Sequence, residues 1–206
     1  MSENPSVFSH EPARATGAEP QAHPSIPEAF RWATMDAPDL WQRVALAAAI
    51  TGADAAFLES PMLFCGPSGC GKTSLACALL REWEARHPGR HGVFMPASRL
   101  GIARVQHRFG RGEPPQVALA RSADLLLLDA LGSECDLATN AVPEVIFARH
   151  EAGLPTWVTT WMTARAITQR YGEGITRRIS EAGRVTVIQW EGLVGAPYEF
   201  LSPDRL

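Results

Sequence analysis

The 206-residue sequence has few cysteines, little net charge and no long apolar run. Its four cysteines form no CxxC pair and have no histidine partner at metal-ligand spacing, which excludes a disulfide scaffold or a zinc finger and predicts reduced thiols. No apolar run approaches the roughly 20 residues that a bilayer span needs, and no basic-then-apolar leader follows Met1. The sequence therefore predicts a cytoplasmic protein that has no membrane partner.

The net charge of −3 argues against nucleic-acid binding driven by overall charge, and the scattered histidines argue against a histidine-based metal or catalytic site. A small net charge gives no overall attraction to nucleic acid, so any DNA contact requires a local basic patch. The six histidines lie too far apart to predict a metal triad or a serine–histidine–aspartate set. With 46% apolar residues, the chain can bury one core of ordinary domain size.

Three regions are expected along the chain. Residues 1–27 contain five prolines and no apolar periodicity, which is typical of a disordered arm. Residues 192–206 are expected to form a loose tail. Between them, residues 28–191 alternate short apolar runs with helical periodicities, beginning with a helix over 40–50. Strands are expected at 62–65, 92–98, 123–131, 156–160 and 184–190, and helices at 72–86, 99–109, 142–147, 164–172 and 173–183. Strands joined by helical crossovers predict an α/β domain with a five-stranded, mainly parallel sheet covered on both faces.

The clearest chemical signal is the stretch GPSGCGKTS, which fits the pattern G-x-x-x-x-G-K-[ST] between an expected strand and an expected helix. Glycines let such a loop wrap around phosphates with its backbone N–H groups aimed inward, and the helix that follows presents its positive end to the same anion. Lys72 would reach the β- and γ-phosphates, and the Thr73 hydroxyl would ligate Mg²⁺. The predicted nucleotide-binding residues are Gly66, Ser68, Gly69, Cys70, Gly71, Lys72, Thr73 and Ser74.

A second signal follows the run LLLLDA. Four leucines predict a buried strand, and Asp129 comes at its carboxyl end, where ligands bind in open α/β sheets. A carboxylate there can hold Mg²⁺ opposite Thr73. Thr73 and Asp129 are therefore the predicted metal-binding residues.

From the P-loop to Trp190 the chain resembles the AAA+ ATPases of the DnaC/DnaI helicase-loader group, which includes the IstB-type transposition ATPases. The segments GPSGCGKTS, LLLLDALGSE, PTWVTTW and RYGEGITRRI carry the resemblance, the last being the most specific. The resemblance implies a P-loop NTPase sandwich of the AAA+/ASCE type. Many AAA+ proteins add a helical lid domain, but the few residues after Trp190 lead us to expect no separate lid domain here. The resemblance further implies ATP and Mg²⁺ as cofactors and a role in DNA replication. The implied partners are further copies of the chain, a replicative helicase or transposase, and single-stranded DNA.

The resemblance also assigns catalytic roles. Lys72 and Asp129 would be the Walker A lysine and the Walker B aspartate, and Thr160 would sense the γ-phosphate. Arg178 falls where the family places an arginine directed at the nucleotide of a neighbouring subunit. The alternative is that Arg177 and Arg178 are ordinary solvated charges.

The chain departs from the family pattern at three positions. Ala130 replaces the acidic residue that normally follows the Walker B aspartate, Trp161 follows two threonines where an asparagine is usual, and Gly174 stands where an arginine is common. Without a positioned base the attacking water is poorly oriented, so we expect slow hydrolysis. Glu134, a few residues further on, is a candidate substitute.

A basic stretch, RLGIARVQHRFGRG, has two interpretations. In AAA+ loaders this segment can face a channel that holds single-stranded DNA, where arginines would contact phosphates and Phe109 would stack on a base. The alternative, which the small net charge favours, is a helix with a basic outer face and with Phe109 in the core.

Three functional hypotheses remain open at this point. The first is an oligomerising AAA+ ATPase of replication or transposition. The second is a small-molecule or nucleotide kinase, which Ala130 favours because a kinase needs no water-polarising glutamate, although no arginine-rich lid precedes residue 155. The third is a nucleotide-gated binding protein with little turnover, which can coexist with the first.

Overall fold

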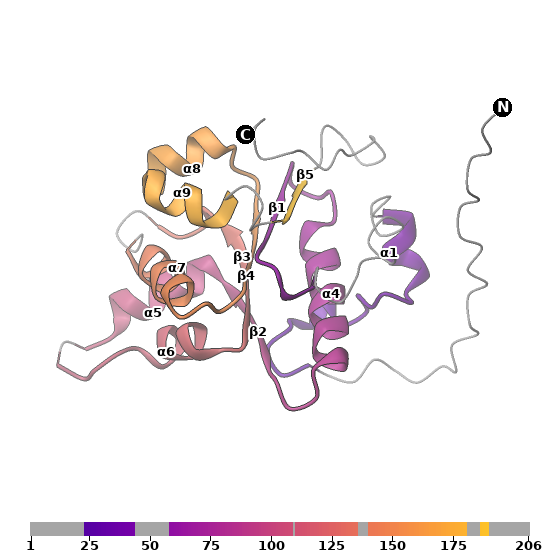
Figure 1. The fold of residues 1–206 in the computed structure, drawn as a ribbon, viewed down its shortest axis with the longest axis horizontal. Coiled ribbons are helices and arrows are strands. Elements are labelled where there is room, and N and C mark those ends of the chain that lie inside the picture. Colours follow the sequence, from indigo (N-terminus) through magenta and orange to yellow (C-terminus); the bar gives the residue numbers. More distant parts are fainter. Residues whose placement is uncertain (1–22, 44–57, 109, 136–139, 181–185, 190–206) are drawn as a thin grey trace.

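The computed structural model describes residues 23–43, 58–108, 110–135, 140–180 and 186–189. Its strands are β1 (Met62–Cys65), β2 (Gly92–Pro96), β3 (Leu125–Leu131), β4 (Thr156–Thr160) and β5 (Thr186–Gln189). They lie in the order β2-β3-β4-β1-β5, and every neighbouring pair is parallel (Figure 1). The predicted α/β class with a parallel sheet is confirmed. Strand β1 leads into the P-loop and strand β3 carries Asp129. These two strands are not neighbours, because β4 lies between them.

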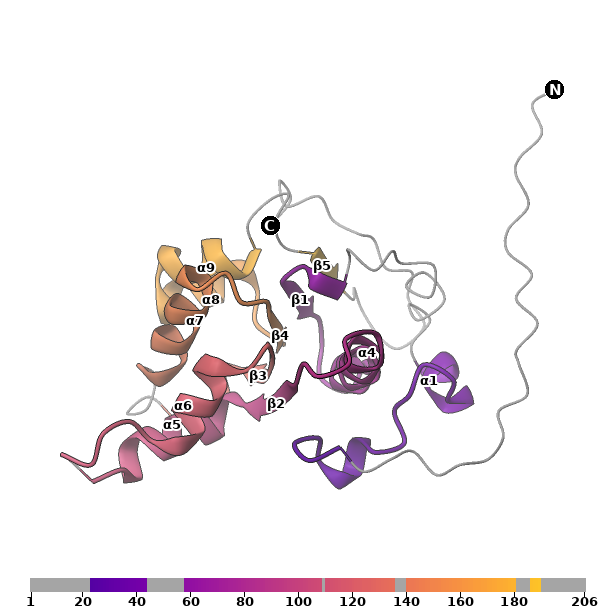
Figure 2. The same ribbon diagram turned by 60° about the horizontal axis from the view of Figure 1, so that its bottom comes forward.

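Helices cover both faces of the sheet. They are the short 3-10 helix η1 (Glu28–Phe30), α1 (Pro38–Arg43), α4 (Lys72–Arg86), α5 (Ala97–Gln106), α6 (Pro115–Ser122), α7 (Ala141–Glu151), α8 (Ala164–Tyr171) and α9 (Glu173–Ser180). Helices α1 and α4 lie on one side of the sheet and α5 to α9 on the other (Figures 1 and 2). Of the helices in the described ranges, none has the length and apolar character to cross a bilayer.

The four leucines of β3 show why a continuous apolar run forms the centre of this fold. Leu125 and Leu127 pack in the core cluster on the α4 side, whereas Leu126 and Leu128 pack in the cluster beneath α5 to α9. Each is 0% exposed. A strand buried on both faces must be apolar at every position, and each buried leucine contributes about 1.5–3 kcal/mol. The polar residue that follows, Asp129, therefore marks the edge of the core.

The first described residues pack onto the domain, although the sequence predicts that they belong to the arm. His23 and Ile26 are 7% and 3% exposed, and His23 Nε2 lies 2.9 Å from Glu84 Oε2 of α4. The backbone N–H of Phe94 in β2 donates to Ser25 Oγ at 2.9 Å. Ordered structure thus reaches at least to His23, on the amino-terminal side of the expected boundary.

The helix boundaries differ from expectation at a few places. Helix α6 was not expected; it begins at Pro115, which suits a first helical position, and buries Val117 and Ala120. Of the helix expected over 40–50, the described part is the end of α1, and the rest lies outside the described residues. Phe109, residues 1–22 and the expected tail also lie outside them.

Candidate functional site

The predicted phosphate loop joins β1 to α4 at the carboxyl edge of the sheet. Gly69 and Gly71 have φ angles of 83° and 94°, in the left-handed region that glycine adopts without strain. A Cβ built on Gly69 would meet nothing within 4 Å, so its backbone conformation rather than crowding favours glycine there. Gly71 caps α4 and supplies no side-chain hydrogen bond to its first turn. The first N–H groups of α4 are therefore left to other partners, the arrangement that binds anions at helix N-termini.

Lys72 sits at the start of α4 with its ammonium folded over the loop. Nζ donates to the carbonyls of Gly66 and Pro67 at 2.8 and 2.7 Å and lies 3.7 Å from Cys70 Sγ. Lys72 is 9% exposed. Its charge is held by neutral acceptors, without a carboxylate among these contacts. An anion in the loop would be a stronger partner for the ammonium than two carbonyls are.

Thr73, in the first turn of α4, and Asp129, near the carboxyl end of β3, are in direct contact. Thr73 Oγ1 donates to Asp129 Oδ1 at 2.8 Å, although the two residues are 56 positions apart in sequence. A hydroxyl and a carboxylate are hard oxygen ligands, so the pair fits Mg²⁺. Among the described residues, no group of three or more His, Cys, Asp or Glu could hold a metal ion by itself. Mg²⁺ needs no such cluster, because it is commonly bound by one or two carboxylates together with phosphates and water.

Thr159 is a site residue that the sequence reasoning did not select. Its hydroxyl donates to the same Asp129 Oδ1 at 2.7 Å and accepts the backbone N–H of Ala130 at 2.8 Å. Ala130 has a φ of 57°, at the register shift between β3 and β4. Thr159 thus holds the carboxylate and an unusual backbone turn in place together.

Thr160, the predicted phosphate sensor, is not brought to this group. It is 0% exposed, its hydroxyl donates to the carbonyl of Leu131 at 3.0 Å, and it accepts the N–H of Met162 at 3.0 Å. Successive side chains of a strand point to opposite faces, so Thr159 and Thr160 cannot both face Asp129. The structure gives the position beside the carboxylate to Thr159.

Glu134 does not take the place of the missing acidic residue. It is 3% exposed, and its carboxylate accepts hydrogen bonds from the Tyr171 hydroxyl and from the backbone N–H of Gly132. Arg170 Nε lies 3.8 Å from the same carboxylate. Burial, together with the hydrogen bond to Glu134, raises the pKa of Tyr171. Glu134 therefore ties the end of β3 to α8, and the suggestion that it serves as the base is wrong for this arrangement.

Arg178 lies in α9, on the opposite side of the sheet from α4 (Figure 2). Its guanidinium donates to the carbonyl of Gly174 at 2.9 Å and lies 4.3 Å from the ring centroid of Phe147, a cation–π contact. The structure does not join Arg178 to Lys72, Thr73 and Asp129 within one chain. A role toward the nucleotide of another copy stays a prediction.

The basic stretch is only partly free. Arg104 of α5 forms an ion pair with Glu144 of α7, whereas Arg99, Arg108 and Arg111 are exposed. Phe109 lies outside the described residues, so the choice between base stacking and core packing for this residue stays open. All four cysteines lie in the described residues and none forms a disulfide; Cys65, Cys70 and Cys77 are buried and Cys135 is exposed.

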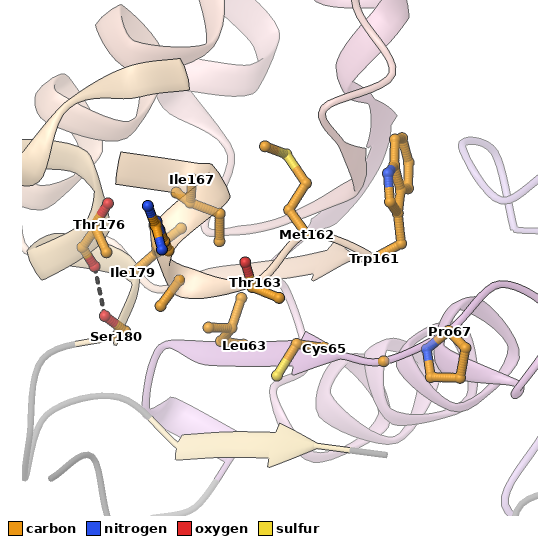
Figure 3. A pocket seen from close by; sticks show the side chains of 13 residues that line it. Leu63, Cys65, Pro67, Trp161, Met162, Thr163, Ile167, Thr176, Ile179 and Ser180 are labelled. Carbon is orange, nitrogen blue, oxygen red and sulfur yellow. Dashed lines mark hydrogen bonds between the residues drawn. The ribbon is translucent and has the colours of Figure 1, made fainter. Parts of the chain in front are cut away.

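A cleft of about 490 Å³ opens beside the first residues of the loop (Figure 3). It lies between the carboxyl ends of β1 and β4 on one side and helices α8 and α9 on the other. Gly66 and Pro67 belong to its lining, so the cleft and the loop share an edge.

Comparison with solved structures shows the same fold in replication proteins. The structure of the DnaC helicase loader superposes with a TM-score of 0.60 and 19% identity, covering 80% of this chain and 100% of that one. DnaI superposes with a TM-score of 0.58 and 16% identity, covering 83% of this chain and 94% of that one. The replication initiator DnaA, in a structure with AMPPCP and single-stranded DNA, superposes with a TM-score of 0.55 and 18% identity over 70% of this chain and 44% of its own.

No protein-family model matches the chain, and no curated protein sequence matches it. At such low identities the structural likeness shows the fold alone. That fold is the one found in DnaC-like AAA+ P-loop ATPases, so the resemblance inferred from the sequence is confirmed at the level of fold.

Proposed function

We propose that this chain binds ATP and Mg²⁺ in the loop of residues 66–73 and acts in DNA replication as a cytoplasmic AAA+ protein of the helicase-loader kind. The observation that carries the proposal is the 2.8 Å hydrogen bond from Thr73 Oγ1 to Asp129 Oδ1. It joins the two parts of the proposed phosphate and magnesium site, which lie 56 positions apart in the sequence. The fold that the chain shares with DnaC and DnaI supports the replication role.

Each residue of the site has a distinct part in binding. The N–H groups of the loop and of the first turn of α4 would bind the phosphates, and the Lys72 ammonium would leave its two carbonyls for the β- and γ-phosphates. Thr73 and Asp129 would hold Mg²⁺, which neutralises negative charge on the phosphates. Thr159 is the positioning residue, because it fixes the Asp129 carboxylate.

We expect turnover to be slow. Ala130 offers no carboxylate to polarise water, and Glu134 is held by Tyr171 and Gly132. The nucleotide-bound state would then last long enough to act as the assembly signal. A carboxylate introduced by Ala130→Glu or Ala130→Asp is expected to raise phosphate release while nucleotide binding persists.

The proposed partners are further copies of the chain, a replicative helicase or transposase, and single-stranded DNA. DnaA in complex with AMPPCP and single-stranded DNA supports the DNA partner, and the exposed Arg99, Arg108 and Arg111 are the candidate phosphate contacts. The ATPase unit is residues 28–191, extended by the packed residues 23–27.

Sedimentation of the purified chain with AMPPCP, with ADP and without nucleotide tests this function. AMPPCP with Mg²⁺ should produce a larger species that the other two conditions lack, and a sedimentation profile that no nucleotide changes would contradict nucleotide-driven assembly. In parallel, Arg178→Ala should retain ATP binding and lose turnover, whereas Arg177→Ala, on the exposed neighbour, should retain both. Normal hydrolysis by Arg178→Ala would remove the arginine from the proposal.

A further inference from the structure

The cleft beside the phosphate loop has the size and the lining of a small-molecule site. A volume of about 490 Å³ lies in the range of ligand pockets, roughly 300–1,000 Å³. Leu63 and Cys65 of β1 and Ile167 and Ile179 of the two helices give it apolar walls. Burial raises the pKa of Cys65 to about 11, so its thiol is uncharged at neutral pH and adds to this apolar surface.

The position of the cleft relative to the loop decides which part of a bound nucleotide it would meet. Gly66 and Pro67, which line the cleft, are also the residues whose carbonyls accept from Lys72 Nζ. Since a P-loop lysine reaches the β- and γ-phosphates, this edge belongs to the terminal end of the triphosphate. The adenosine of that ATP extends from the α-phosphate, at the other end. A molecule in the cleft would therefore be a second ligand that faces the γ-phosphate.

The rim of the cleft offers an aromatic surface and a cation. Trp161 is 48% exposed, and in Figure 3 it stands at the same end as Pro67, away from Thr176 and Ser180. A Cβ on Gly132 would come within 2.5 Å of Met162 Sδ and 3.4 Å of Trp161, so the glycine lets both residues lie against the end of β3. An exposed indole is a stacking surface for a flat ring.

Arg165 provides the charge. Among the described residues that line the cleft it is the only ionised one, and it is exposed in the first turn of α8. The hydroxyls of Thr163 and Ser180 are already bonded to helix backbone, Thr163 accepting the N–H of Ala166 at 3.2 Å and Ser180 donating to the carbonyl of Thr176 at 2.6 Å. An arginine beside apolar walls and an indole favours a ligand with a flat ring and an anionic group.

We propose that the cleft binds a nucleoside monophosphate, with its base on Trp161 and its phosphate on Arg165, next to the γ-phosphate of an ATP held in the loop. This inference rests on the proposed function in one respect, which is that ATP occupies the loop of residues 66–73. The site adds a small-molecule input to a protein otherwise proposed to respond to ATP.

Calorimetry with a split ligand tests the proposal. Inorganic tripolyphosphate with Mg²⁺ fills the loop first, and AMP, GMP, CMP and UMP are then titrated separately. At least one should bind, with affinity about tenfold lower in Trp161→Ala and in Arg165→Gln, a loss of about 1.4 kcal/mol. Two controls lie outside the cleft. Leu119→Ala removes a large apolar side chain that is as exposed as Trp161, and Arg177→Gln removes an exposed arginine of α9. Both variants should bind the nucleotides as the wild type does. The proposal is overturned if none of the four nucleotides binds, or if both cleft variants bind normally.

Two further titrations distinguish this proposal from binding of the ATP base in the cleft and from failure of the proposed function. Trp161→Ala should bind ATP and tripolyphosphate as the wild type does; if ATP binding alone weakens, the base in the cleft belongs to ATP and the second-ligand proposal is wrong. If neither tripolyphosphate nor ATP gives heat in the presence of Mg²⁺, the proposed function fails, and the four nucleotides are titrated into the protein directly. Binding that the two cleft variants weaken then supports the cleft by itself, and absence of binding overturns it.

Discussion

Lys72 and Arg149 are two buried cations that both donate to backbone carbonyls, and they behave as opposites. Lys72 lies at the carboxyl edge of the sheet, is 9% exposed and makes two carbonyl hydrogen bonds. Arg149 lies in α7 and is 0% exposed. Its guanidinium donates to the carbonyls of Ala120, Arg121, Ala123 and Pro155 and to the Thr156 hydroxyl, at 2.6 to 3.3 Å.

The difference between these cations separates a binding group from a structural one. Arg149 joins the chain leading into β3 to the chain leading into β4, and with every nitrogen bonded and the side chain fully buried it is not accessible to a ligand. Burial lowers its pKa to about 10, which still leaves it charged at neutral pH. Lys72 donates to the carbonyls of Gly66 and Pro67, two neutral acceptors that a phosphate in the loop could replace. The number of hydrogen bonds that each cation makes, and whether a ligand can reach it, distinguish Lys72 from Arg149 better than burial alone does.

The largest expected effect is on stability, from Arg149→Met. Removing the guanidinium leaves buried carbonyls without donors, so the free energy of unfolding should fall by about 3–5 kcal/mol. Urea unfolding followed by circular dichroism measures it. Arg86→Met removes an exposed arginine paired with Glu82 at 2.7 Å and should change stability by less than about 1 kcal/mol. Equal losses in the two variants would contradict the structural role of Arg149.

Lys72→Ala should show the reverse pattern. ATP affinity is expected to fall about 100-fold, or about 2.7 kcal/mol, because the ammonium no longer reaches the β- and γ-phosphates. The free energy of unfolding should change by less than about 1 kcal/mol, since two carbonyl bonds to a partly accessible group are lost. Isothermal titration and urea unfolding on the same sample check both. A Lys72 variant that binds ATP normally but unfolds easily would place the lysine in the same class as Arg149.

The adjacent threonines repeat the comparison within one strand. Thr159→Val removes the hydroxyl that holds Asp129 and should lower the affinity for magnesium-bound ATP about tenfold. Thr160→Val removes a buried hydroxyl between Leu131 and Met162 and should lower stability by about 1–3 kcal/mol with ATP affinity intact. Parallel titrations and unfolding curves compare them. If Thr160→Val is the variant that loses affinity, the sensor role returns to Thr160.

The smallest expected effect is at Ala130. Its φ of 57° disfavours any residue with a side chain, so Ala130→Gly should raise the free energy of unfolding by a few tenths to about 1 kcal/mol. Ala118→Gly, in the middle of α6, should lower it by about 0.5–1 kcal/mol. Thermal unfolding of both variants gives the signs, and a loss of stability in Ala130→Gly would show that the turn carries no strain.

Local pattern explains what the sequence could predict. The loop of residues 66–73 is specified by glycines, a lysine and a threonine within a few positions, and Asp129 ends a run of leucines that can only be buried. Which threonine faces Asp129 depends on the register between β3 and β4, including the shift near Ala130, and no single strand encodes it. Glu134 could not be placed either, because its partner Tyr171 is distant in sequence.

Arg149 did leave a signal that could have been used. It continues the buried stripe of Val142, Val145 and Ile146 at helical spacing, so its side chain had to enter the core and find partners there. The packing of residues 23–27 left a weaker one. A histidine and a serine among prolines give no local pattern that predicts the contact of His23 with Glu84 or the hydrogen bond of Ser25 to β2.

The central claim is that the loop and the Thr73–Asp129 pair bind ATP together with Mg²⁺. Calorimetric titration of the folded wild type and of Asp129→Asn with ATP, with and without Mg²⁺, tests it most directly. The wild type should bind ATP, and Mg²⁺ should tighten that binding. Asp129→Asn should bind magnesium-free ATP as the wild type does and lose most of the gain from the metal. Absence of heat from the wild type with ATP and Mg²⁺, or a gain from Mg²⁺ that Asp129→Asn retains in full, would contradict the claim.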